Sequence, residues 1–206
     1  MLRTRSTVPV WAAAVLFTTS TFGMTVIHGD VAASTEGTGA TFSGTLNYVH
    51  LGGSVGELTV TLSNDTPAHI GGLLTAFVFR FDTVDMSATT MLTSSTVPSM
   101  TNTGTTSGSP FGTYMGGAGV GGTYLGGGMP SGGLAVGASG TFVWTITASD
   151  AAMLTDSSFV NASHNPGLLA RFRGLEDGGS DKVPGVPTPG SLALIGLGLL
   201  AAGRRR

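Results

Sequence analysis

The chain has no cysteine and few charged residues. Asp, Glu, Lys and Arg together account for 10% of its 206 residues, whereas an ordinary soluble domain contains about 25%. The absence of Cys excludes disulfides, thiolate zinc sites and a cysteine nucleophile. Such a fold depends on packing alone, and a hydrophobic fraction of 41% is enough to build a core in one domain of this length.

The basic residues are placed unevenly along the chain. Residues 7–203 contain four basic residues against eleven acidic ones, a net charge of −7. Because an acidic surface does not replace the counterions of a nucleic acid, the sequence predicts no nucleic-acid partner. The other five basic residues lie near the two ends, as Arg3, Arg5, Arg204, Arg205 and Arg206.

The N-terminal segment has the order of a secretory signal peptide. A basic start is followed by an apolar stretch at residues 8–17 and then by small and polar residues up to Gly23. We expect residues 1–23 to be a signal peptide, with Ala33 as a later candidate for the cleavage site. The alternative is a buried N-terminal strand or helix.

The C-terminal segment combines a proline-rich linker at residues 179–189 with an apolar stretch and a basic end at residues 190–206. The apolar run from Gly190 to Gly203 would form a helix of about 21 Å, shorter than the roughly 30 Å hydrocarbon core of a membrane. The terminal arginines would stay on the cytoplasmic side. The sequence therefore predicts a transient transmembrane helix, with an ordinary C-terminal anchor as the alternative.

This tail resembles the PEP-CTERM sorting signal, which exosortase processes in Gram-negative bacteria. The motif is Val186, Pro187, Thr188 and Pro189, with Thr188 where the usual motif has Glu, and it precedes the apolar helix and Arg204, Arg205 and Arg206. Residues 168–185 also resemble the last strand and linker of a group of PEP-CTERM surface proteins. The resemblance implies export, transient inner-membrane association, processing by exosortase and release to the cell surface or the extracellular matrix.

Between the two ends the sequence predicts an all-β domain. Leu58, Val60 and Leu62 alternate with threonines, which is the period of two of a half-buried strand. Short Thr-rich strands separated by glycine turns favour a single β-sandwich over residues 34–178, with an immunoglobulin-like arrangement as one option. The expected core residues are Leu58, Val60, Leu62, Phe77, Phe79, Phe142, Trp144, Ile146 and Phe172.

The segment from Ile70 to Asp82 is apolar on both faces, which places it at the centre of a sheet. The pattern predicts Leu73, Phe77, Phe79 and Phe81 on one face and Leu74, Ala76 and Val78 on the other.

Residues 98–133 are rich in glycine and contain a repeat at a spacing of ten, Gly112–Gly117 and Gly122–Gly127. Glycine at this density disfavours regular strands. Two interpretations remain open. The segment is either a long, partly disordered loop, or a hairpin whose Tyr114 and Tyr124 form an adaptable interaction surface.

Motifs that carry chemistry are few. The sequence has no HExxH pattern and no Gly-x-Ser-x-Gly turn, so we expect no catalytic residues and no cofactor. Weak calcium candidates are Asp82, Asp85, Asp177 and Asp181, for which solvated turn carboxylates are the alternative. Trp144 would suit sugar stacking, but its alternation with Phe142 and Ile146 favours the core.

Three functions remain open on the sequence alone. The first is a non-enzymatic surface or matrix protein with a structural or adhesive role, associated with exopolysaccharide. The second is a carbohydrate-binding module, which needs an exposed row of aromatic residues. The third is a secreted hydrolase, which needs converging acidic residues.

Overall fold

The computed structural model describes residues 23–126, 129–160 and 166–188. Strands and short 3-10 helices account for the regular structure of this part of the chain. The strands are β1 (Thr25–Gly29), β2 (Phe42–Gly52), β3 (Val55–Asn64), β4 (Gly71–Phe79), β5 (Thr89–Ser95), β6 (Met100–Asn102), β7 (Thr106–Ser107), β8 (Thr113–Tyr114), β9 (Gly116–Val120), β10 (Ser139–Thr147), β11 (Leu168–Leu175) and β12 (Ser180–Pro187). The 3-10 helices are η1 (Val31–Ala33), η2 (Pro130–Gly132), η3 (Ala151–Met153) and η4 (Asp156–Phe159).

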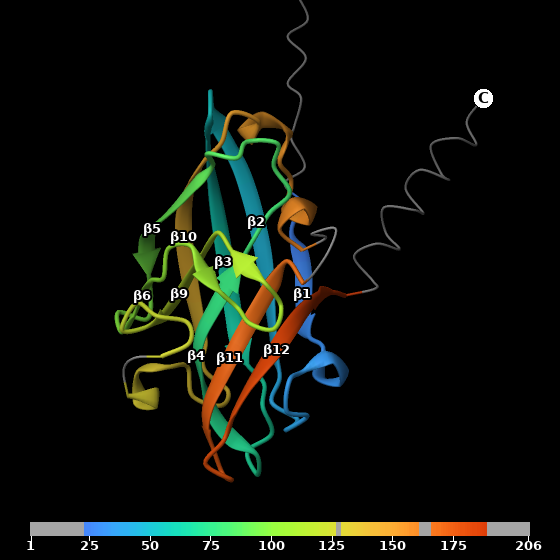
Figure 1. Cartoon of the computed structure of the whole chain (residues 1–206), viewed down its shortest axis with the longest axis vertical. Coiled ribbons are helices and arrows are strands. Elements are labelled where there is room, and N and C mark those ends of the chain that lie inside the picture. The colour runs from blue at the N-terminus through green and yellow to red at the C-terminus, as the bar shows by residue number, and fades with distance from the viewer. Residues whose placement is uncertain (1–22, 127–128, 161–165, 189–206) are drawn as a thin grey trace, which may run out of the picture.

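Ten of these strands form one antiparallel sheet in the order β5-β10-β3-β2-β1-β12-β11-β4-β9-β6, and β7 pairs only with β8 (Figure 1). The end strands β5 and β6 contact each other, so the sheet curls around its core and nearly closes. The all-β prediction is confirmed. The structure differs from the expected sandwich because the strands belong to one continuous sheet and not to two facing ones.

The core is aromatic and lies on the inner face of this sheet. Phe77 packs edge-on against Phe142 with ring centroids 4.8 Å apart, and Phe79 packs edge-on against Trp144 at 5.0 Å. Edge-to-face contacts of this kind add to the free energy gained by burying the rings. All nine predicted core residues are fully buried, and Trp144 is a core residue and no sugar platform.

Strand β4 is buried on both faces, as the sequence predicts, but one pair of residues is exchanged. Leu74 lies in the inner core with Phe77, whereas Leu73 is only partly buried. The cause is a shift in register against β11: Leu74 pairs with Phe172 and Ala76 with Arg171, which leaves Thr75 as an extra residue. Such a bulge reverses the alternation of side chains beyond it.

The glycine-rich segment forms strands as well as turns, which corrects the prediction of a loop. Strand β9 pairs with β4 and β6 inside the main sheet. Its glycines are required by close packing: a Cβ atom on Gly117 would lie 2.2 Å from the carbonyl oxygen of Phe77, and one on Gly119 would lie 2.3 Å from that of Thr123. Glycine therefore serves here to bring strands together.

The rest of that segment lies on the outer face of the sheet. We call residues 104–114 and 121–126 the outer flap. Its Tyr114 and Tyr124 pack on Ala76 and Val78 of β4 and on Leu169 of β11. This second cluster is separated from the main core by the sheet itself and explains why β4 is apolar on both faces.

The ends of the domain also differ from the prediction. Ser180–Pro187, expected to be part of a linker, is strand β12, which lies between β11 and β1. Ile27 of β1 is fully buried and pairs with Pro187, and the amide of Thr188 donates to the carbonyl of Val26 at 2.9 Å. The domain therefore extends from β1 to β12, beyond the expected limits of 34 and 178.

The predicted signal peptide and C-terminal helix fall almost wholly outside the described residues. Within the part that the structure does describe, no helix is long and apolar enough to cross a membrane.

Candidate functional site

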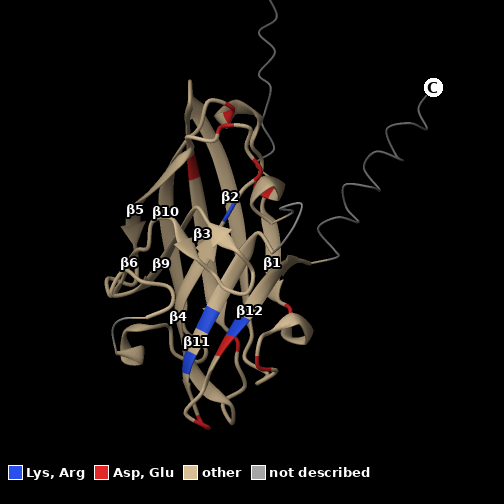
Figure 2. Ribbon diagram, in the orientation of Figure 1, with Lys and Arg blue, Asp and Glu red and all other residues tan. Residues whose placement is uncertain are grey.

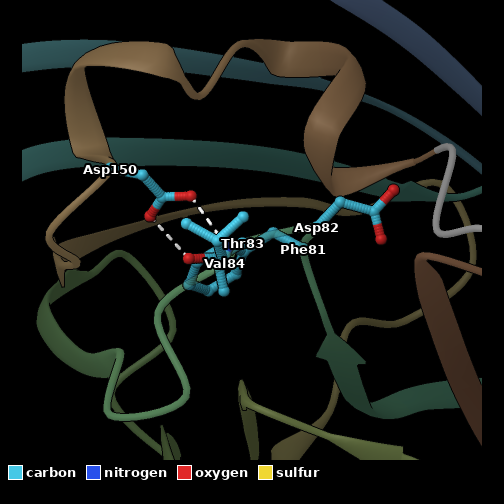
Figure 3. A pocket seen from close by; sticks show the side chains of 5 residues that line it. All are labelled: Phe81, Asp82, Thr83, Val84 and Asp150. Carbon is cyan, nitrogen blue, oxygen red and sulfur yellow. Dashed lines mark hydrogen bonds between the residues drawn. The ribbon is translucent and has the colours of Figure 1, made fainter.

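Two turns meet at one end of the sheet and form an open hollow of about 390 Å³ (Figure 3). It is lined by Phe81, Asp82, Thr83, Val84 and Asp150. The carboxylate of Asp150 accepts hydrogen bonds from the hydroxyl of Thr83 at 2.6 Å and from the amide of Val84 at 2.9 Å. Asp82 points away from Asp150, so the two carboxylates do not converge.

Asp85 holds the same two turns together. One of its oxygens accepts from the amide and the hydroxyl of Ser87, and the other accepts from the amide of Ser149 at 2.7 Å. These hydrogen bonds, led by that of the Ser87 hydroxyl, lower the pKa of Asp85 to about 2. The pKa of Asp150 is also lowered, mainly by the bond from Thr83. Both carboxylates are ionised at neutral pH and bind protein donors.

Asp181 and Asp177, the other calcium candidates, serve different local structures. Asp181 is 1% exposed and accepts from the amides and hydroxyls of the segment 35–38. Burial alone would raise the pKa of Asp181, but the hydrogen bonds from Thr38, Glu36 and Lys182 outweigh it and lower the pKa. Asp177 is exposed and accepts from the amide of Gly179 in the turn before β12.

The structure therefore does not bring the four candidate carboxylates together at one place. Asp82 and Asp85 share a turn, but protein hydrogen bonds occupy the oxygens of Asp85. Across the ranges that the structure describes, no group of three or more His, Asp or Glu residues is placed to hold a metal ion.

Tyr114 and Tyr124 are buried, at 0% and 1% exposure, so they do not form the exposed aromatic surface that the repeat suggested. Both rings anchor the outer flap to the sheet. The glycine pattern alone does not reveal this burial, because the residues that cover the rings come from β4 and β11, distant in sequence.

The basic residues of the domain gather beside the outer flap, which the sequence did not predict. Arg171 and Lys182 are direct neighbours across β11 and β12. Arg173 lies two residues further along β11 and therefore on the same face as Arg171. Figure 2 shows the basic segments of these two strands close together. Arg171 donates to the carbonyl of Tyr124 at 2.7 Å, and Lys182 donates to the carbonyl of Ser109. These cations hold the flap by its backbone.

Arg80, directly after β4, completes the set. Its guanidinium donates to the carbonyl of Phe111 at 2.7 Å and lies 4.4 Å from the centre of the Tyr114 ring. The contact with the ring is a cation–π interaction. All four Lys and Arg residues of the described ranges thus lie around one surface of an otherwise acidic body.

The residues of the predicted sorting motif begin inside the fold. Val186 and Pro187 are the last two residues of β12 and pair with His28 and Ile27 of β1. Both the amide and the hydroxyl of Thr188 donate to the carbonyl of Val26. Pro189 and the arginines at 204–206 lie outside the described residues.

Comparison of the chain with protein-family models, curated proteins and solved structures gives no match. Its function is therefore inferred from its own residues.

Proposed function

We propose that this protein is exported and sorted by its C-terminal segment, and that it acts at the cell surface or in the extracellular matrix in a structural or adhesive role without catalysis. The sequence supports this proposal with a basic and apolar N-terminus, and with a Pro-x-Pro motif followed by a short apolar run and three arginines. Exosortase is the processing partner, and exopolysaccharide is the proposed associate at the surface.

The observation that carries the proposal is the position of the motif at the end of the domain. The last hydrogen bonds of the sheet in the described residues are those of Thr188 to β1. A protease that cuts after Thr188 would remove the apolar tail and leave every strand of the sheet in place. Processing and folding are therefore compatible.

A carbohydrate-binding module is the weaker candidate. That function needs exposed aromatic rings on which a sugar can stack. Tyr114 and Tyr124, the two tyrosines that the sequence suggested for this role, are buried. Association with exopolysaccharide would instead rely on polar and charged surface groups.

The test is to express the chain in a Gram-negative host with an exosortase, isolate surface-exposed protein and sequence both ends. We expect an N-terminus between Gly23 and Thr25 and a C-terminus between Thr188 and Gly190. The same host without exosortase is the control and should retain the chain in the membrane fraction. Recovery of surface protein that ends at Arg206 would refute the proposed processing.

A further inference from the structure

Three buried hydrogen-bond donors beneath the outer flap have no acceptor. The hydroxyls of Tyr114 and Tyr124 and the Nε atom of Arg171 are fully buried and donate no hydrogen bond within the protein, although the Arg80 side chain, which can only donate, lies close to the Tyr114 hydroxyl. A buried donor without an acceptor loses its hydrogen bonds to water and forms no hydrogen bond within the protein to replace them. Because this costs free energy, such atoms are rare in native proteins. Three in one place indicate that an acceptor belongs there.

These donors belong to one cluster. Tyr114 and Tyr124 pack together against Ala76 and Leu169 on the outer face of β4 and β11. Arg171 lies opposite Ala76 in the pairing of these strands and donates through another nitrogen to the carbonyl of Tyr124. Burial raises the pKa of Tyr124, the neighbouring Tyr114 raises it further, and the charge of Arg171 opposes this. Tyr114 and Arg171 are therefore both close enough to Tyr124 to change its pKa.

The cluster carries positive charge. Arg80 and Arg171 donate to backbone carbonyls of Pro166, Phe111 and Tyr124, which do not neutralise a guanidinium. Burial lowers the pKa of Arg171, and the positive charge of the neighbouring Arg173 lowers it further, because both disfavour the charged form of the guanidinium. An oxyanion would accept hydrogen bonds from the two tyrosine hydroxyls and from Arg171 Nε, and its negative charge would stabilise the charged form of Arg171.

We propose that the outer flap and β11 form a binding site for a small oxyanion, with Tyr114, Tyr124 and Arg171 as the direct ligands and Arg80 as a second positive charge. The ligand is either a free inorganic anion, such as phosphate, or the carboxylate of an acidic sugar. Both ligands carry negatively charged oxygen atoms, which accept hydrogen bonds from these donors. The inference rests on the described residues alone and does not depend on how the protein is sorted.

The experiment follows the near-ultraviolet absorbance of tyrosine during titration of the full chain with inorganic phosphate, with chloride keeping the ionic strength constant. The chain has three tyrosines, Tyr48, Tyr114 and Tyr124, and two tryptophans, so single Tyr→Phe variants assign the signal. We expect a saturable change for the native chain. Because a hydrogen bond to a charged group contributes about a factor of ten or more in affinity, Tyr124→Phe and Tyr114→Phe should each weaken binding at least tenfold.

Tyr48→Phe is the matched control. The hydroxyl of Tyr48 is buried like the other two, but it donates to the carbonyl of Ala151 at 2.8 Å and lies apart from the flap. This variant should bind phosphate as the native chain does. Arg171→Met should abolish binding, and circular dichroism of each variant checks that the fold is kept.

Glucuronate and glucose, titrated in the same way, distinguish the two sources of the anion. Binding of phosphate but not glucuronate identifies a free anion as the ligand, and binding of glucuronate identifies an acidic sugar. Glucose should not bind. The proposal is overturned if neither anion gives a saturable response, if Tyr124→Phe responds as the native chain does, or if glucose binds as well as glucuronate.

Discussion

At the scale of single residues, Asp181 joins two segments that are distant in sequence. It lies on the inner face of β12, opposite Phe172, and its oxygens accept from Thr35, Glu36 and Thr38 as well as from Lys182. The segment between η1 and β2 is thereby fixed to the edge of the core. A buried carboxylate is stable there only because several donors surround it.

Asp181 makes stability depend on pH. Its pKa is lower in the folded protein than in the unfolded chain, so its contribution to the free energy of unfolding is complete above the unfolded value near 4 and is lost as the pH falls through the folded value. We expect Asp181→Asn to destabilise the fold by about 1–3 kcal/mol at pH 7. The loss of stability between about pH 5 and pH 3 should be smaller in this variant than in the native chain.

Urea unfolding at pH 7, 5 and 3 measures this effect. Asp65→Asn is the control, because Asp65 is exposed, and it should change the free energy of unfolding by less than about 0.5 kcal/mol at pH 7. Equal pH dependence in the native and Asp181→Asn chains would show that Asp181 has no role in acid unfolding.

Gly117 is a second residue whose role is set by its neighbours. Since a Cβ atom there would clash with the backbone of Phe77 and Val78, Gly117→Ala should push β9 away from β4 and destabilise the fold by about 1–3 kcal/mol. Gly126→Ala is the matched control, because a Cβ at Gly126 meets nothing within 4 Å. The two variants are compared by urea unfolding at pH 7, and equal midpoints would argue against close packing of β9.

At the scale of elements, strands with regular alternation are predictable from the sequence. β3 and β10 alternate buried and partly exposed residues, and the six core residues that the sequence predicts in these two strands are all buried. This is a local signal, because one face of each strand meets the core and the other meets solvent.

Strands β1, β9 and β12 carry no such signal. β12 contains Pro184 and Pro187, which usually argue against a central strand. β9 is mostly glycine, and β1 follows an apolar segment that resembles a signal peptide. The cluster beneath the outer flap was missed for a related reason: it is assembled from the flap, β4 and β11, and no single stretch of sequence contains it.

The place of β1 limits where the N-terminus can be processed. Cleavage after Ala33 would remove the strand that lies between β2 and β12, together with the buried Ile27. We expect a chain that starts at residue 34 to lose cooperative thermal unfolding, whereas one that starts at residue 24 keeps it, because only the second retains the paired sheet. Differential scanning calorimetry of the two chains measures this, and similar transitions would show that β1 is dispensable.

At the scale of the whole molecule, the folded body and the C-terminal tail are expected to be energetically independent. A chain that ends at Pro189 keeps every strand of the described sheet, so we expect deletion of residues 190–206 to leave the melting temperature of the body within about 1 °C. A chain that ends at Gly178 lacks β12 and should not fold, because β1 and β11 then lose a shared partner. A clear fall in melting temperature for the first truncation would mean that the tail packs on the body.

The pairing of β1 with β12 also has a consequence for the time at which the molecule becomes ordered. Ile27 cannot pair with Pro187 until the ribosome has added Pro187, 160 residues later. Contacts between such distant residues also form slowly, because a long loop must close first. Until then β1 and β11 each expose a row of unpaired backbone groups to which a strand of another nascent chain can bind. Among the strands of the described residues, β12 is synthesised last, and its pairing with β1 and β11 prevents these strands from binding another copy of the chain.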